Sequence, residues 1–111
     1  MGMINENQIL ANVGGDKMLL KLVLKDYLGS FPKDIIEITQ YSQEENLKQM
    51  KAIAHRALSG TRILVIDQMI ELLEKIEYAE HIDVAREGLE EINALLPQLK
   101  NEIDGMLRES N

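Results

Sequence analysis

The chain has 111 residues, of which 45% are hydrophobic and 4% aromatic, and this fits one domain of residues 1–111 with an apolar core. It contains no Cys, which excludes disulfides and thiolate metal sites, and its formal net charge of −7 argues against nucleic acid as a partner. No secretory signal and no apolar run long enough to span a membrane is present, so we expect a cytoplasmic protein.

The first two predicted helices lie on either side of a glycine pair. Residues 4–13 are predicted to form a short helix that ends at Gly14 and Gly15. Asp16 is a suitable N-cap for the next helix, which carries a broad apolar stripe. Pro32 marks a helix start or a kink, after which the sequence continues in helical register.

Three more helices are predicted after this point. Ser42 and Glu45 have the spacing of a capping box, which would open the next helix there. The β-branched residues within 63–66 predict a break, and Asp67 lies near the start of a further helix. In the last helix, apolar residues recur in steps of four and three, and the pattern resumes in phase after Pro97, where we expect a kink. These residues are Ala85, Leu89, Ile92, Leu96, Leu99, Ile103 and Met106.

The composition is rich in good helix formers, and no run alternates apolar and polar residues as a half-buried strand would. We therefore predict an all-α fold: an up-and-down antiparallel four-helix bundle with a short N-terminal helix. A monomer is expected.

One segment departs from the acidic character of the chain. Between Asn46 and Ile66 there is no acidic residue. Such a basic segment in an acidic chain would attract an anion. It contains four basic residues: Lys48, Lys51, Arg56 and Arg62.

His55 lies within this basic segment. On a helical wheel its side chain is roughly 130° from the centre of the apolar positions, so it faces outward. Ala52 and Ser59 lie one turn away on either side, and these small residues leave the imidazole open to an approaching protein. An ordinary solvated surface histidine is the alternative interpretation.

Glu77 is the predicted neighbour of His55. If the turn between the two helices is centred on Ile66, residues 55 and 77 are equally far from it, and antiparallel packing brings them level. A carboxylate that accepts the Nδ1–H of the imidazole fixes its tautomer and leaves Nε2 free as a nucleophile. Without this pairing, Glu77 would be read as a solvated helix carboxylate.

Metal and hydrolase sites fit the sequence less well. The other histidine, His81, is not part of a Glu-x-x-His pair of the di-iron type, and we read it as a capping or surface residue. Ser59 has no strained nucleophile turn around it. No metal site and no cofactor site are expected in this chain.

The segment AHRALSGTRILVI (54–66) resembles the motif of histidine-containing phosphotransfer (HPt) domains, roughly Ala-His-x-Leu-Lys-Gly-Ser/Ala followed by a small-residue turn. Residues 10–38 are similar to the opening pattern of that family, with Gly-Gly-Asp, a Leu-rich helix and a proline. Residues 69–77, MIELLEKIE, resemble its following helix. The resemblance covers nearly the whole chain.

The resemblance implies a phosphocarrier of two-component phosphorelays rather than a turnover enzyme. His55 would receive a phosphoryl group from the aspartate of one receiver domain and pass it to another, and Glu77 would orient the imidazole. The implied partners are response-regulator receiver domains and a hybrid sensor kinase. Mg²⁺ would be held by the receiver.

Three positions depart from the family pattern. Leu58 stands where the family usually has Lys, while Ser59 and Val65 stand at usual Gly positions. By the wheel, Lys51 and Arg62 lie near His55 and either could supply the missing cation.

The expected docking residues around His55 are Ala52, Ser59, Lys48 and Arg56. Two other functions stay open. One is a diverged HPt-like bundle that docks on a receiver or kinase without transferring a phosphoryl group, and the other is an unrelated structural bundle.

Overall fold

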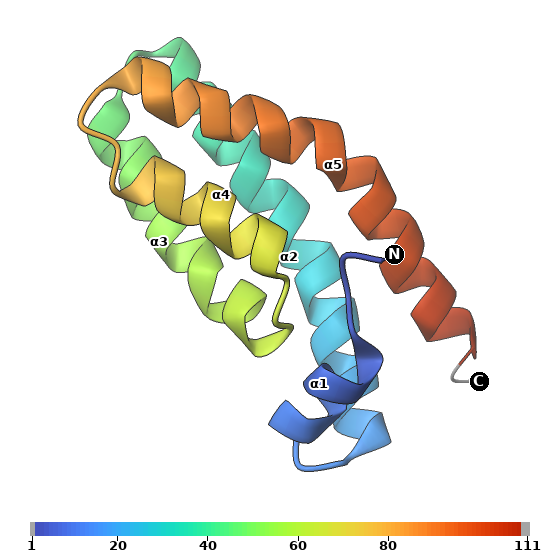
Figure 1. Cartoon of the computed structure of the whole chain (residues 1–111). Helices are drawn as coiled ribbons and strands as arrows, with labels where there is room; N and C mark the ends of the chain where they lie inside the picture. The colour runs from blue at the N-terminus through green and yellow to red at the C-terminus, as the bar shows by residue number, and fades with distance from the viewer. Residues whose placement is uncertain (1, 110–111) are drawn as a thin grey trace.

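The computed structural model describes residues 2–109, and within them the chain forms five helices and no strand (Figure 1). The all-helical prediction is therefore confirmed. The helices are α1 (Glu6–Asn12), α2 (Lys17–Gln43), α3 (Leu47–Ile63), α4 (Asp67–Glu77) and α5 (Ile82–Glu109).

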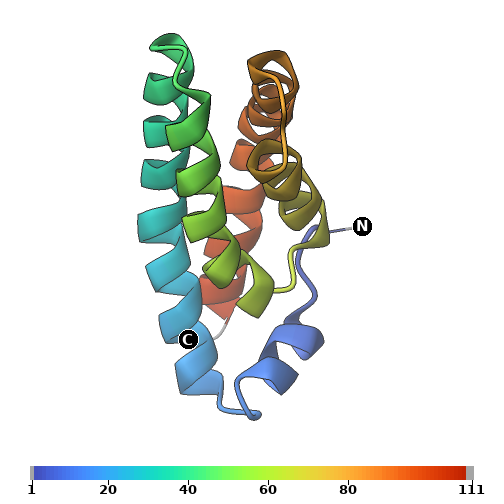
Figure 2. The ribbon, with the colours of Figure 1, turned by 90° about the vertical axis from the view of Figure 1, so that its left-hand side faces the viewer.

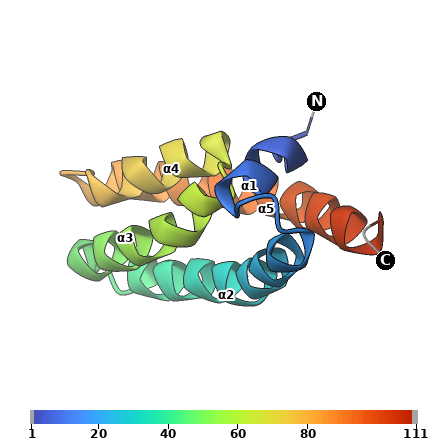
Figure 3. The same cartoon turned by 90° about the horizontal axis from the view of Figure 1, so that it is seen from below.

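The helices pack as a bundle around one core. α2 contacts both α3 and α5, α4 contacts the same two helices, and α1 lies against α2. Figures 2 and 3 show the resulting elongated shape, which measures 43 × 23 × 23 Å. Large side chains from all five helices fill the core. The largest fully buried ones include Ile9, Phe31, Ile35, Ile38, Met50, Leu58, Leu73, Ile76 and Ile92.

Three helices begin at a side-chain cap. Asn5, Asp16 and Asn46 each place a carboxylate or amide oxygen where it accepts hydrogen bonds from backbone N–H groups of the first helical turn. These N–H groups have no partner inside the helix. The prediction that Asp16 caps α2 is confirmed.

The predicted capping box at Ser42 and Glu45 is wrong, because α2 continues through Ser42 and Asn46 caps α3 instead. Ser42 is buried, its Oγ accepts a hydrogen bond of 3.0 Å from Arg86 Nε, and its carbonyl accepts one of 2.6 Å from Nη2 of the same guanidinium. Burial of the α2 stripe, which extends to Ile38 and Ser42, overrides the local capping signal.

Neither proline interrupts a helix. Pro32 lies inside α2 and Pro97 inside α5. The helical register after Pro32 and Pro97 is therefore the continuous one that the apolar pattern predicted.

The first three helices end with the same backbone geometry. The residue after each C-cap is left-handed: Gly14 has φ 68°, Glu45 has φ 56° and Val65 has φ 52°. The N–H of the following residue then bonds a carbonyl five residues back, as Asn46 does to Tyr41 at 2.8 Å. This is the Schellman motif. Glycine adopts it freely, whereas a residue with a Cβ is strained by roughly 1–2 kcal/mol.

Because Glu45 is exposed and left-handed, replacing it with Gly relieves backbone strain without removing a buried side chain. We expect Glu45→Gly to raise the free energy of unfolding by about 0.5–1 kcal/mol, after the larger chain entropy of Gly is subtracted. Urea denaturation followed by circular dichroism measures this change.

The neighbouring residue Glu44 is the matched control for this substitution. It is also exposed, but its φ is −84°. Glu44→Gly gains nothing at the backbone and is expected to lower stability by about 0.5–1 kcal/mol. If both substitutions destabilise to the same extent, the left-handed strain at Glu45 is absent in solution.

Candidate functional site

His55 lies in the middle of α3, on the side that faces away from the core. Its side chain is 73% exposed, as the helical wheel predicted. The opposite side of α3 is buried. That side consists of Met50, Ile53, Ala54, Ala57, Leu58 and Thr61.

A buried hydrogen bond fixes the rotation of α3 against α2. The Tyr27 hydroxyl and Thr61 Oγ1 are 2.9 Å apart, and Thr61 Oγ1 donates to the Ala57 carbonyl at 2.8 Å. Burial raises the pKa of Tyr27 well above its ordinary value, so the hydroxyl keeps its proton. Breaking this pair would leave the buried Tyr27 hydroxyl without its partner, which is costly. His55 is held outward as a consequence.

Glu77 is the last residue of α4, and its Oε2 is hydrogen-bonded to Nδ1 of His55. A close approach between helices supports this placement. A Cβ on Gly88 of α5 would come within 3.1 Å of Ile76 Cγ1 and 3.2 Å of the Leu72 carbonyl. The glycine therefore lets the C-terminal half of α4, which carries Glu77, pack directly against α5.

The hydrogen bond determines which imidazole nitrogen is reactive. A carboxylate only accepts hydrogen bonds, so Nδ1 of His55 carries the proton and Nε2 carries the lone pair. The exposed imidazole therefore presents a nucleophilic nitrogen to solvent, with the negative charge of Glu77 behind it.

The two small residues beside His55 are both exposed. Ala52 lies one turn before it and Ser59 one turn after. The Ser59 hydroxyl donates to the Arg56 carbonyl at 3.2 Å, so it is turned back onto its own helix. Both side chains are smaller than the imidazole, which is 73% exposed, so a partner surface can reach the ring.

Two of the four predicted cations are engaged by carboxylates of neighbouring helices. Arg56 Nη2 lies 2.6 Å from Asp34 and 3.2 Å from Glu37, both on α2. The hydrogen bond to Asp34 raises the pKa of Arg56. Arg62 Nη2 lies 4.0 Å from Glu74 on α4. Arg56 therefore joins α3 to α2, and the charge of Arg62 is partly balanced.

The two lysines have no such partners. Within residues 2–109, neither Lys48 nor Lys51 makes an ion pair. Lys51 is half-buried and lies one turn before His55, whereas Lys48 is exposed and two turns away. Lys51 is thus the nearest cation on α3 that no carboxylate engages.

The departures from the family pattern have clear structural settings. Leu58 is fully buried, so a lysine at this position would enter the core instead of reaching His55. Val65 takes the left-handed conformation at the end of α3, the conformation that glycine adopts without strain.

Sequence reasoning missed the acidic residues that engage the arginines. Asp34 and Glu37 lie on α2 and Glu74 lies on α4. No local spacing links them to Arg56 or Arg62, because the pairing depends on the register between packed helices.

The second histidine stands apart from this site. His81 is exposed, and its backbone carbonyl accepts hydrogen bonds from Val84 and Ala85 N–H at the start of α5. His81 is thus an exposed residue whose backbone carbonyl accepts hydrogen bonds at the start of α5.

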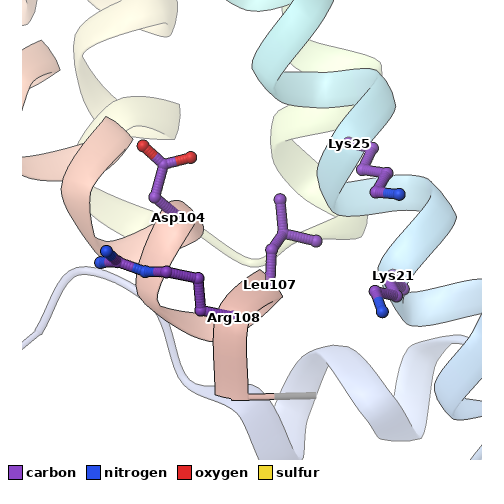
Figure 4. A pocket seen from close by; sticks show the side chains of 5 residues that line it. All are labelled: Lys21, Lys25, Asp104, Leu107 and Arg108. Atoms are coloured by element: carbon purple, nitrogen blue, oxygen red, sulfur yellow. The ribbon is translucent and has the colours of Figure 1, made fainter. Parts of the chain in front are cut away.

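A hollow of about 270 Å³ lies between the beginning of α2 and the end of α5. Figure 4 shows Lys21 and Lys25 on one wall and Asp104, Leu107 and Arg108 on the other. Neither α3 nor α4 lines this hollow, so it is separate from the His55 site.

Across residues 2–109, no group of three or more His, Asp or Glu side chains is arranged to hold a metal ion. In the same residues no helix combines the length and the apolar character that crossing a membrane requires. Comparisons with protein-family models, with curated proteins and with solved structures find no match to the chain.

The Glu77 hydrogen bond predicts the tautomer of His55. In the unmodified protein, neutral His55 should carry its proton on Nδ1. We expect Glu77→Ala to shift the population toward the Nε2–H form, which is the favoured form of a free imidazole in water. The ¹⁵N chemical shifts of the ring nitrogens report this directly.

Two further variants complete this test. Glu77→Gln keeps a side-chain oxygen that accepts the same hydrogen bond, so it should retain the Nδ1–H form. Glu74→Ala removes a carboxylate one turn away and should leave the His55 tautomer unchanged. A wild-type ring that is already mainly Nε2–H would show that Glu77 does not orient it.

Proposed function

We propose that this chain is a histidine phosphotransfer domain, a phosphocarrier in a cytoplasmic two-component relay. The observation that carries the proposal is the exposed imidazole of His55, whose Nδ1 is held by Glu77 and whose Nε2 faces solvent. The proposed architecture is the up-and-down antiparallel four-helix bundle, with α1 as the short N-terminal helix.

The proposed reaction is a phosphoryl exchange between two proteins. Nε2 of His55 attacks the phosphorus of a receiver aspartyl phosphate, the N–P bond forms as the P–O bond to the aspartate breaks, and the aspartate leaves as a carboxylate. The reverse exchange with a second receiver regenerates free His55. Positioning and charge stabilisation account for most of the catalysis of such transfers. The required Mg²⁺ is proposed to belong to the receiver.

Docking is proposed to take place on the side of α3 that carries His55. The exposed small side chains of Ala52 and Ser59 allow a partner to approach the ring. Lys48 is exposed and unpaired within residues 2–109, so it is suited to an acidic partner surface. Arg56 is exposed too, but its guanidinium is already shared with Asp34 and Glu37.

A second candidate function is a module that docks on a receiver or kinase without accepting the phosphoryl group. It is favoured by the balanced charge of Arg62, which lies near Glu74, and by the absence of a lysine at the buried position 58. The two functions differ in one observable, the appearance of phosphohistidine on this chain.

The first test is phosphorylation of His55. Incubation with a phosphorylated receiver domain should place an acid-labile, base-stable phosphoryl group on the wild-type chain. His55→Gln should abolish this labelling and keep the helical circular dichroism, because the exposed side chain contributes nothing to the core. His81→Gln is the matched control and should label normally.

The outcomes separate the two functions. Receiver binding by the wild-type chain without any labelling favours the docking module. Label that persists on His55→Gln contradicts the assignment of His55 as the acceptor.

The second test concerns the cation that stabilises the transferred group. A phosphoryl group brings roughly two negative charges, and a charge-assisted hydrogen bond from Lys51 would stabilise it. We expect Lys51→Ala to slow transfer about tenfold, the order of magnitude of one such bond. Arg62→Ala should slow transfer less, because Glu74 already balances that guanidinium.

Rapid-quench kinetics with a labelled receiver measure these rates. Lys100→Ala, an exposed lysine of α5, is the control and should transfer at the wild-type rate. Equal rates for the Lys51 and Lys100 variants would remove Lys51 from the proposed mechanism.

A further inference from the structure

The outer side of α2 carries large apolar side chains that nothing in the bundle covers. α2 runs along one edge of the molecule in Figure 2 and along the lower edge in Figure 3, with no helix on its outer side. On this helix Met18 is 75% exposed, and Leu22 and Ile36 are each 59% exposed. They are among the most exposed large hydrophobic residues of the described chain.

These side chains share one face of the helix with a glycine. On a helical wheel, Met18, Leu22, Gly29 and Ile36 fall within roughly 40° of one another. Within residues 2–109, a Cβ at Gly29 would meet no atom within 4 Å, and its φ is not in the left-handed region. Nothing in the described part of one chain therefore requires glycine here, and glycine destabilises a helix interior relative to alanine.

The spacing on this face is symmetric about Gly29. Leu22 lies seven residues before it and Ile36 seven residues after it. If a second copy of α2 crosses antiparallel with the two-fold axis at Gly29, Leu22 of each copy meets Ile36 of the other. The glycine lets the two backbones approach at the crossing point. A two-fold interface requires this kind of self-complementary surface.

The charges beside the face have the same symmetry. Asp26 and Lys33 are exposed, lie on one edge of the face, and make no ion pair within residues 2–109. They are two helical turns apart, too far to pair within one chain. Across a dyad at Gly29, Asp26 of each copy faces Lys33 of the other. Lys25 lies on the opposite edge, roughly 80° from Lys33.

We propose that two copies of this chain associate through the outer face of α2, antiparallel and centred on Gly29. Contact along a single helix is small, below about 1,200 Å² in total, so the dimer is reversible and depends on concentration. The proposed dimer differs from the monomer expected from the sequence. The proposal does not rest on the phosphotransfer function. The proposed contact does not involve α4, which carries Glu77 and lies across the bundle from α2 (Figure 3).

Sedimentation velocity with the full chain, up to millimolar protein, tests the association. The wild-type sedimentation coefficient should rise from the monomer toward the dimer value as concentration increases. Asp26→Lys replaces two symmetric ion pairs with repulsive contacts and should weaken dimerisation about tenfold. Adding Lys33→Asp to Asp26→Lys reverses both charges and should restore wild-type association.

The apolar contact has a matched pair of variants. Ile36→Ser removes an exposed isoleucine from the proposed interface and should prevent dimerisation. Ile63→Ser removes an exposed isoleucine at the end of α3 and should leave it unchanged. Circular dichroism confirms that each variant is folded before it is compared.

Two results would overturn the proposal. One is a wild-type chain that stays monomeric up to millimolar concentration, which would leave this face to a partner protein or a membrane surface. The other is a dimer that neither Asp26→Lys nor Ile36→Ser weakens, which would place the contact elsewhere.

Discussion

The orientation of α3 about its own axis is the constraint on which the site depends. The Tyr27–Thr61 hydrogen bond and the apolar side of α3 fix this orientation. A rotation of one residue position, about 100°, toward the core would bury His55 and expose core side chains. The energy that holds the imidazole outward therefore comes from residues that never touch it, and an exposed reactive ring is compatible with a rigid backbone beneath it.

The electrostatics of the site follow from carboxylates on the two helices that flank α3. α2 supplies Asp34 and Glu37 to Arg56, and α4 supplies Glu74 to Arg62 and Glu77 to His55. Two of the four cations of the basic segment, Arg56 and Arg62, thus lie beside carboxylates in the folded chain. A patch of positive charge in sequence becomes a surface where only the lysines keep unpaired charge within the described residues. Such a surface selects binding partners by where its charges lie more than by its net charge.

The parts of the structure that the sequence predicted are those governed by local periodicity. The outward direction of His55 follows from a 3.6-residue repeat. Its alignment with Glu77 follows because the two residues are equally far along the chain from Ile66. The capping box at Ser42 failed because a four-residue signal competed with a helix stripe that is buried by distant residues. The carboxylate partners of Arg56 could not be predicted, because the register between two helices depends on how the side chains of their facing surfaces pack together.

The left-handed turn at Val65 gives the connection between α3 and α4 a fixed length. α3 ends at Ile63 and α4 starts at Asp67. The positions of His55 and Glu77 along their helices are therefore both counted from the same short turn. An added or lost residue inside α4, between Asp67 and Glu77, would turn Glu77 by about 100° and shift it by about 1.5 Å relative to this turn. A length change far from the imidazole would thus separate the pair while every side chain in it stayed intact.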